Sequence, residues 1–243
     1  MTETPTPYGR LVVGTPDVLF ARAVEIAAAQ HAKRVSRHFT WALSGGTTPQ
    51  DWFRWVVARK ALSRELIEES HFTVSDERMV PLNSDQSNFG NAERWLLSPL
   101  KVPQDHRHPW VVAYSPAEAA EAYRKTWFLI AGPGKAYDVC MLGMGDDAHT
   151  ASFFPGTPLF DDDGGLPFAA VNAGERGWRL TLTPTGLRIC RQIIVMALGE
   201  GKAEALRRVM RSEEPWSQVP AKILSTASDC VTWLVDEAAA SKL

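Results

Sequence analysis

Short apolar runs alternate with longer amphipathic segments along most of this 243-residue chain. In the longer segments, apolar residues recur three or four positions apart, which is typical of helices that bury one face. The short runs predict β-strands at residues 11–13, 38–43, 71–75, 110–114, 139–142, 168–171, 179–183, 193–198 and 231–235. The longer segments predict helices that start near Thr15, Thr48, Asn88, Ser115 and Lys202, and a short helix at the end of the chain. This alternation predicts an α/β fold with a mostly parallel sheet.

The chain contains no internal repeat and no linker, so we expect a single domain over residues 9–243. Residues 1–8 are expected to form a loose N-terminal tail, and residues 231–235 are expected to close the sheet. The hydrophobic content of 45% and the charged content of 22% are ordinary for a globular domain.

Charge and cysteine usage narrow the possible partners and the compartment. The net charge of -2 argues against nucleic acid or an anionic membrane as a bulk partner, so an anionic substrate would need a few local cations. Cys140, Cys190 and Cys230 are far apart and form no CxxC pattern, which disfavours a disulfide framework or a zinc ribbon. The N-terminus lacks the apolar core of a signal peptide, and no apolar run approaches the ~20 residues of a membrane span. We therefore expect a cytoplasmic protein, and we leave its oligomeric state open.

Polar residues gather where predicted strands end, and this is where α/β proteins usually hold their chemistry. The turn Ser44-Gly45-Gly46-Thr47 joins a strand to a helix, so its free N–H groups and the helix dipole would form an anion site. A plain strand–helix turn that needs glycine for its backbone angles is an equally open interpretation, because the P-loop pattern is absent. Asp76-Glu77-Arg78 follows the next strand as either a solvated turn or a group of active-site residues.

Lys202 stands in the first turn of a predicted helix, after Gly199-Glu200-Gly201. A lysine at this place opposes the helix dipole at a cost of a few tenths of a kcal/mol, and a bound anion would reverse the sign. A lysine that simply extends into water remains an alternative.

His149 is the strongest catalytic candidate among the six histidines, because it follows a strand end, two glycines and a carboxylate. An imidazole can take a proton from water and return it to a leaving oxygen. Asp147 could hold the tautomer of the ring, or it could be only a turn residue.

Three other chemistries fit this stretch less well. Residues 143–148 match a dinucleotide-binding pattern, but the helix that should follow is cut at Pro155-Gly156, and two aspartates would repel a pyrophosphate. No GxSxG pattern supports a serine nucleophile. Asp146, Asp147 and His149 are a thin metal-ligand set without a second histidine cluster, so we expect no metal.

An ordered set of motifs resembles the 6-phosphogluconolactonase family. The matching segments are LSGGTTP at 43–49, SDERMVP at 75–81, SN at 87–88, LGMGDDAHTASFFPG at 142–156, RLTLT at 179–183 and GEGKA at 199–203. They occur in the family's order and spacing and cover most of the chain from about residue 40 to 205. The resemblance implies a Rossmann-like three-layer sandwich and hydrolysis of 6-phosphoglucono-1,5-lactone, a small phosphosugar, in the oxidative pentose phosphate pathway.

The resemblance also implies roles for individual residues. His149 resembles the general base and acid, with Asp147 beside it, and Asp76 and Arg78 would line the lactone end of the site. The substrate-binding residues that it implies are Ser44, Gly45, Gly46, Thr47, Asn88, Arg179 and Lys202. Because a lactone is already an activated ester, no metal or nucleotide cofactor is expected.

One departure from the family and two alternatives stay open. The family usually has glycine where this chain has Ala148, next to His149. A hexosamine-6-phosphate deaminase of the same fold is one alternative, although Phe154 occupies the position of that enzyme's glutamate. The other is a non-catalytic sugar-phosphate sensor, which would carry a helix-turn-helix extension for which we expect no room before the first strand.

Overall fold

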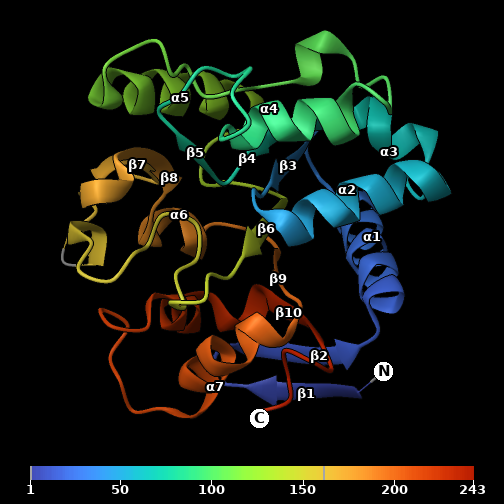
Figure 1. The fold of residues 1–243 in the computed structure, drawn as a ribbon. Helices are drawn as coiled ribbons and strands as arrows, with labels where there is room; N and C mark the ends of the chain where they lie inside the picture. Colours follow the sequence, from blue (N-terminus) through green and yellow to red (C-terminus); the bar gives the residue numbers. More distant parts are fainter. Residues whose placement is uncertain (1, 161) are drawn as a thin grey trace.

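One mostly parallel β-sheet with helices on both faces organises the computed structural model, which describes residues 2–160 and 162–243 (Figure 1). Its strand order is β1-β2-β10-β9-β6-β3-β4. In that order the strands are Thr2–Thr6, Gly9–Gly14, Val231–Asp236, Ile193–Ala197, Val139–Gly143, Phe39–Leu43 and Ser70–Val74. Every neighbouring pair is parallel except β1 and β2. The prediction of a single α/β domain with a mostly parallel sheet is confirmed.

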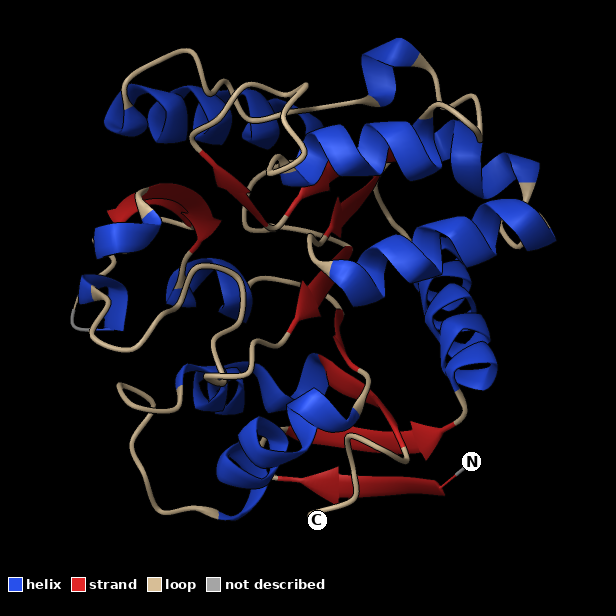
Figure 2. Ribbon diagram, viewed as in Figure 1, coloured by secondary structure: helices blue, strands red, loops and turns tan. Residues whose placement is uncertain are grey.

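Helices cover the sheet on two sides, as Figure 2 shows. The α-helices are α1 (Pro16–Ala32), α2 (Thr47–Arg59), α3 (Arg64–Glu69), α4 (Asn88–Ala92), α5 (Pro116–Ala131), α6 (Pro184–Arg188) and α7 (Ala203–Arg211). A π-helix, η1 (Glu93–Leu97), continues α4, and short 3-10 helices lie at η2 (Gln104–His106), η3 (Pro158–Phe160), η4 (Gly174–Arg176), η5 (Glu200–Lys202) and η6 (Pro220–Cys230). Helix α1 packs on β2 and β10, whereas α5 packs on β3 and on a second, smaller sheet. No helix in the described part of the chain is long and apolar enough to cross a membrane.

The central strands are buried along their whole length, which explains their continuous apolar sequences. Every residue of β3, β4 and β9 is buried, as expected for parallel strands covered on both faces. Trp41 of β3 packs against Trp52 of α2 and Phe72 of β4, with ring centroids 5.8 and 5.7 Å apart. These aromatic contacts join the sheet to the helix whose first turn borders the site.

A separate antiparallel sheet contains β5 (Asp76–Arg78), β8 (Trp178–Leu182) and β7 (Phe168–Asn172). The predicted strands at 168–171 and 179–183 therefore exist but do not join the main sheet. Ser75 links the two sheets, because its N–H donates to Leu43 O at 2.8 Å and its carbonyl accepts from Leu182 N at 3.0 Å. The chain thus turns at the end of β4 and carries Asp76 and Arg78 across the carboxyl edge of the main sheet.

Four local predictions are wrong. Residues 2–6 are not a loose tail but strand β1, which pairs antiparallel with β2 and so satisfies its backbone hydrogen bonds. Residues 231–235 do not close the sheet, because β10 lies between β2 and β9 and the edge strands are β1 and β4. The end of the chain after Asp236 forms turns rather than a helix.

The predicted strand at 110–114 is also absent, since the segment forms turns. Trp110 is instead a core anchor: its ring stacks on Tyr123 with centroids 3.6 Å apart, and its Nε1 donates to Val74 O at 3.1 Å. Burial of one large aromatic ring, rather than strand pairing, accounts for the apolar character of this segment.

Four histidines gather at the amino-terminal ends of β3 and β4. The His71 ring stacks on His106 and His108, with centroids 4.2 and 5.1 Å apart, and meets His38 edge-on at 4.4 Å. His71 Nδ1 and His108 Nε2 are 2.8 Å apart and share one hydrogen bond. Burial, followed by the charges of the neighbouring histidines, lowers the pKa of His71 to about 3. Burial and His106 lower the pKa of His108 to about 4. His71 and His108 are therefore neutral in the folded protein near neutral pH.

We predict that acid destabilises the fold through this cluster. An unfolded histidine has a pKa of about 6.5, so between about pH 4 and 6.5 the unfolded chain binds more protons than the folded one. The free energy of unfolding should fall as the pH drops through this window, by at most about 1.4 kcal/mol per pH unit for each histidine. Urea denaturation at several pH values measures this slope.

The variant His71→Gln, which retains a hydrogen-bonding partner for His108, isolates the contribution of the cluster. Its unfolding free energy should depend less steeply on pH than that of the parent chain. Other titrating groups, including the buried Glu77, are common to both proteins and cancel in the comparison. Equal slopes would contradict the prediction.

Candidate active site

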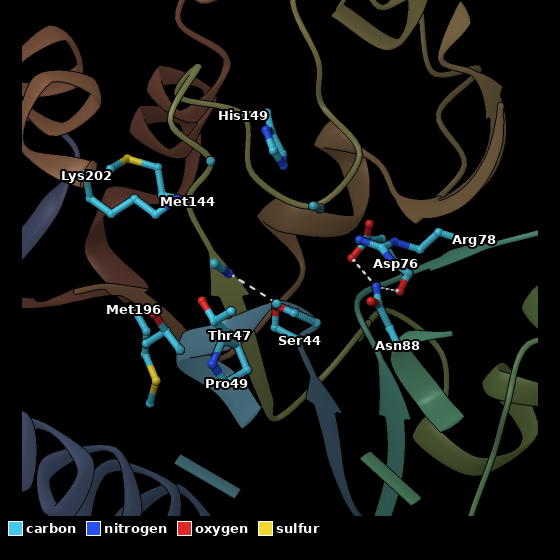
Figure 3. Close-up of a pocket in the computed structure, with 16 residues that line it drawn as sticks. Ser44, Thr47, Pro49, Asp76, Arg78, Asn88, Met144, His149, Met196 and Lys202 are labelled. Carbon is cyan, nitrogen blue, oxygen red and sulfur yellow. Dashed lines mark hydrogen bonds between the residues drawn. The ribbon is translucent and has the colours of Figure 1, made fainter. Parts of the chain in front are cut away.

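A cavity of about 260 Å³ opens at the carboxyl ends of β3, β4 and β6 (Figure 3). Segments that are far apart in the sequence line it: residues 44–49, Asp76, Arg78, Asn88, residues 143–145, His149, Ala151, Met196 and Lys202. The structure thus brings together all the residues singled out from the sequence except Asp147, which lies behind His149, and Arg179. Figure 3 shows Lys202 and Arg78 on opposite sides of the cavity, with Ser44 and His149 between them.

The glycine turn after β3 leads directly into α2, and Gly46 with a φ of 99° is the N-cap residue of that helix. A helix N-terminus leaves its first N–H groups without partners inside the helix, and these groups border the cavity at Thr47 and Thr48. Ser44 Oγ accepts a hydrogen bond from Gly143 N at 3.1 Å, which ties the end of β3 to the end of β6. The turn is therefore held rigidly against the strand that leads to His149.

Gly45 and Asn88 lie so close together that only glycine fits. A Cβ atom at position 45 would stand 1.8 Å from Asn88 Oδ1. The Nδ2 atom of Asn88 donates to the Asp76 carbonyl at 2.8 Å and to Asp76 Oδ1 at 3.3 Å. The other carboxylate oxygen of Asp76 accepts from Ser152 Oγ at 2.8 Å. Asp76 is thus buried and held from two sides at the rim of the cavity.

Glu77 supports this arrangement from beneath and was not selected as a site residue from the sequence. Its fully buried carboxylate accepts hydrogen bonds from Ser87 Oγ, Asn88 N and Phe89 N, at 2.8 to 2.9 Å, and so caps α4. Burial raises the pKa of Glu77, although these hydrogen bonds oppose the shift. The only signal for Glu77 in the sequence was its place in the triplet Asp76-Glu77-Arg78. A charged triplet does not distinguish a buried carboxylate that caps a helix from a carboxylate exposed to solvent.

His149 lies at the end of a tight turn that begins at Gly145. Gly145 N donates to the His149 carbonyl at 2.8 Å, and a Cβ atom on Gly145 would stand 2.1 Å from His149 Nδ1. Asp147 Oδ1 accepts from both the Nδ1 atom of His149, at 2.5 Å, and its backbone N–H, at 3.0 Å. With Nδ1 engaged in this way, Nε2 is the ring nitrogen left for proton transfer.

Asp147 is ionised in this arrangement. Burial alone would raise the pKa of its carboxyl, but hydrogen bonds from His149 and then from Arg176 outweigh that effect and hold the pKa below its usual range. An ionised carboxylate at Nδ1 favours the tautomer in which Nδ1 carries the proton and Nε2 is free to act as a base.

Arg179 and Lys202, which the family resemblance both implied as substrate-binding residues, do not line the same cavity. Arg179 lines a smaller adjoining cavity of about 120 Å³, together with Arg78, Arg176, Phe154 and the shared His149. Burial, followed by the charge of Arg78, lowers the pKa of Arg179. Two cationic regions therefore flank His149: the glycine turn with Lys202 on one side, and the arginines on the other.

Arg176 was missed from the sequence. It lies in η4, at the tip of the hairpin between β7 and β8, and donates to Asp147 Oδ2 at 2.9 Å. The Gly174-Glu175-Arg176-Gly177 turn was recognisable from its glycines, but nothing in the sequence indicated that the tip reaches Asp147 from another sheet.

No cluster of three or more histidine, cysteine, aspartate or glutamate side chains within the described residues could hold a metal ion. The groups that line or support the two cavities are the imidazole of His149, the carboxylates of Asp76 and Asp147, and the cations described above.

The fold and the site define an α/β protein with a glycine turn at a helix N-terminus and a histidine–aspartate pair at the carboxyl ends of its strands. The family described as glucosamine-6-phosphate isomerases/6-phosphogluconolactonase matches residues 15–233, and the chain belongs to this family.

Relatives of known name agree with this assignment. The chain is 31% identical over 233 residues to the 6-phosphogluconolactonase of Synechocystis sp., with 93% of this chain and 94% of the relative covered. It is also 31% identical to the 6-phosphogluconolactonase of Rattus norvegicus over 252 residues, covering 98% and 95%. The structure of 6-phosphogluconolactonase from Trypanosoma cruzi superposes with a TM-score of 0.81 at 27% identity, covering 100% of this chain and 98% of the other.

Ala148 adopts a conformation that normally favours glycine. Its φ is 64°, its side chain is fully buried, and its carbonyl accepts from Ala221 N at 2.9 Å. An alanine with a left-handed backbone conformation costs about 1 kcal/mol relative to a right-handed one. The turn therefore keeps its shape in spite of the methyl group, and His149 remains in the cavity.

We predict that Ala148→Gly leaves kcat/KM within about threefold of the parent, because the backbone already has the conformation that glycine would adopt. Glycine removes the strain of the left-handed backbone, which stabilises the variant. It also removes a buried methyl group and makes the unfolded chain more flexible, which both destabilise the variant. Because these effects oppose each other, the free energy of unfolding should change by less than about 1 kcal/mol. Ala148→Val, with its branched Cβ, should cost about 1–3 kcal/mol and reduce activity. Thermal unfolding and steady-state kinetics measure both, and a tenfold gain for Ala148→Gly would mean that alanine displaces His149.

Proposed function

We propose that this protein is a 6-phosphogluconolactonase, which hydrolyses 6-phospho-D-glucono-1,5-lactone to 6-phospho-D-gluconate in the oxidative pentose phosphate pathway. The observation that carries the proposal is the His149–Asp147 pair, held at 2.5 Å between an anion-binding turn and a group of arginines. Relatives named 6-phosphogluconolactonase that match almost the whole chain support the same conclusion.

The phosphate binds at the turn formed by Ser44, Gly45, Gly46 and Thr47, with Lys202 as its counter-charge. The N-terminus of α2 supplies oriented N–H donors and the positive end of its dipole, and both favour a dianion. A phosphate at this place also offsets the unfavourable interaction between the charge of Lys202 and the dipole of the helix that it begins. Asn88, which touches Gly45 and Asp76, borders the sugar between the two ends of the cavity.

The lactone carbonyl then lies toward His149 and Arg78. Nε2 of neutral His149 takes a proton from water as the water oxygen attacks C1, and Asp147 stabilises the resulting imidazolium. Arg78 donates to the developing oxyanion, which is a charge-assisted interaction in a partly buried site. The tetrahedral intermediate collapses, the bond from C1 to the ring oxygen breaks, and the imidazolium returns its proton to that oxygen.

Arg179 lines the smaller cavity beside Arg78 and Asp76, toward which the lactone carbonyl points in this proposal. We assign it to the carboxylate that forms at C1, because two guanidinium groups can neutralise the product anion. The reaction consumes water alone, so it calls for no cofactor. The substrate is a small phosphosugar rather than a nucleic acid, and its pathway is consistent with a cytoplasmic location.

Phe154 favours the lactonase over the hexosamine-6-phosphate deaminase. It lies five residues after His149, where the deaminase pattern has a glutamate, and its ring packs on the His149 ring with centroids 4.7 Å apart. A phenyl ring cannot exchange protons with an aminosugar. A purely sugar-binding protein would have no use for an ionised carboxylate that fixes the histidine tautomer.

We predict that the purified protein accelerates 6-phosphogluconate formation from fresh lactone above the spontaneous rate. His149→Ala and His149→Gln should lower kcat by at least about 100-fold, because neither side chain can act as a base. Both variants should still bind 6-phosphogluconate, as measured by calorimetry. Full activity of His149→Gln would refute the mechanism, and ammonia release from glucosamine 6-phosphate would favour the deaminase.

A separate prediction tests Lys202 as a phosphate ligand. Lys202→Gln should raise KM for the phosphorylated lactone by about 10-fold or more, because a charge-assisted interaction contributes about 1.5–3 kcal/mol. Glucono-1,5-lactone, which has no phosphate, should be hydrolysed equally by the variant and the parent. Lys33→Gln, on the exposed end of α1, is the matched control. A similar loss with both lactones would exclude Lys202 as a phosphate ligand.

A further inference from the structure

Arg176 reaches the turn that carries His149 from the smaller cavity, outside the cavity that the glycine turn and Lys202 line. Its Nη2 donates to Asp147 Oδ2 at 2.9 Å, while the other oxygen of the same carboxylate accepts from His149. The carboxylate of Asp147 is therefore held at both ends, and rotation about its Cβ–Cγ bond would break one of the two interactions.

Phe154 closes this arrangement into a ring of contacts. The guanidinium carbon of Arg176 stands 4.5 Å from the centroid of Phe154, and the same phenyl ring packs on the His149 ring with centroids 4.7 Å apart. Arg176 thus meets His149 by two routes, one polar through Asp147 and one through the aromatic ring. A cation over an aromatic face is stabilised electrostatically and also keeps water from that face.

The hairpin holds Arg176 in place. Ala173 N donates to Gly177 O at 3.1 Å and Gly177 N donates to Gly174 O at 2.9 Å, and both glycines have positive φ angles, of 62° and 73°. The Arg176 carbonyl also accepts a hydrogen bond from Arg179 Nη1. The backbone that carries Arg176 is therefore fixed by contacts on both sides.

We propose that Arg176 is a positioning residue for His149, which acts through Asp147 and Phe154 and does not bind the substrate. This inference rests on the proposed lactonase function of the same site. It accounts for an arginine whose side chain is 47% exposed but which contacts the partner of the catalytic histidine. An ion pair this exposed contributes little to stability, so its effect should appear in catalysis.

Removal of Arg176 has a defined electrostatic consequence. The charged groups around His149 are Asp146 and Asp147 on its own turn, Asp76 and Arg78 on β5, Arg176 and Arg179 of the β7–β8 hairpin region, and Lys202 across the cavity. Loss of the Arg176 cation removes repulsion of the imidazolium and leaves Asp147 free to pair with it alone. The acidic limb of the pH profile of kcat/KM should therefore move upward, by about half a pH unit.

The test compares Arg176→Gln with a matched variant, Arg54→Gln. Arg54 also stacks on an aromatic ring, that of Trp95 at 4.6 Å, also pairs with an aspartate, Asp51 at 3.0 Å, and is 48% exposed, but it is not in the site. We expect Arg176→Gln to lower kcat about tenfold with KM within twofold, and Arg54→Gln to leave both unchanged. Arg176→Lys, which keeps the charge but loses the planar stack, should lie between Arg176→Gln and the parent.

Two further measurements separate the possible outcomes. In an Asp147→Asn background, Arg176→Gln should cause a smaller loss of kcat than in the parent, because the polar route to His149 is already broken and only the contact through Phe154 remains. The NMR titration of the His149 ring signal, assigned with His149→Ala, should have a higher midpoint in Arg176→Gln than in the parent. This readout needs no turnover, so it tests the inference even if the parent protein fails to hydrolyse the lactone.

The inference is overturned if the pH profile and the ring titration of Arg176→Gln superpose on those of the parent. A rise in KM with unchanged kcat would also overturn it, since Arg176 would then be a substrate ligand. A loss in the Asp147→Asn background as large as the loss in the parent would show that Arg176 does not act through Asp147. If Arg176→Gln melts far below the parent, the same criteria apply to Arg176→Met, which removes the charge but keeps an unbranched side chain that can lie over Phe154.

Discussion

The parallel pairing of β3 with β4 and β6 is the constraint on which the site depends. Parallel strands end at the same edge of a sheet, so the segments that follow Leu43, Val74 and Gly143 must meet there. The fully buried aromatic core beneath these strands keeps them in register. Ser75 then adds a second sheet at this edge, so the cavity receives side chains from two sheets as well as from α2 and η5.

Close backbone approach makes this edge rigid. Gly45 lies against Asn88, and Gly145 lies against His149, at distances that no Cβ atom would allow. Buried carboxylates of Asp76 and Glu77 tie these turns to β5 and α4 through hydrogen bonds. A rigid polar frame of this kind orients an imidazole before substrate arrives, so little reorganisation is needed during the reaction.

Charge is divided along the cavity in a way that suits a substrate with two polar ends. The helix N-terminus and Lys202 form one positive region, the arginines form the other, and the ionised Asp147 stands behind the imidazole between them. A phosphate would be fixed far from the proton-transfer step, so binding and catalysis can be changed separately. The net charge of the whole chain, which is -2, gives no hint of this local separation.

The sequence by itself determined the α/β class, most of the strands and the glycine turn before α2, and it offered Asp147 as one possible partner of His149, because these follow from local periodicity, glycine placement and short spacing. It did not determine that residues 2–6 form an edge strand, since antiparallel pairing of a short polar segment leaves no apolar pattern. Only the tertiary structure decided that Arg179 joins Arg78 rather than Lys202, and that Arg176 bonds to Asp147 from another sheet. Those contacts join residues about thirty to a hundred positions apart, and their geometry arises from the packing of two sheets, which no local pattern encodes.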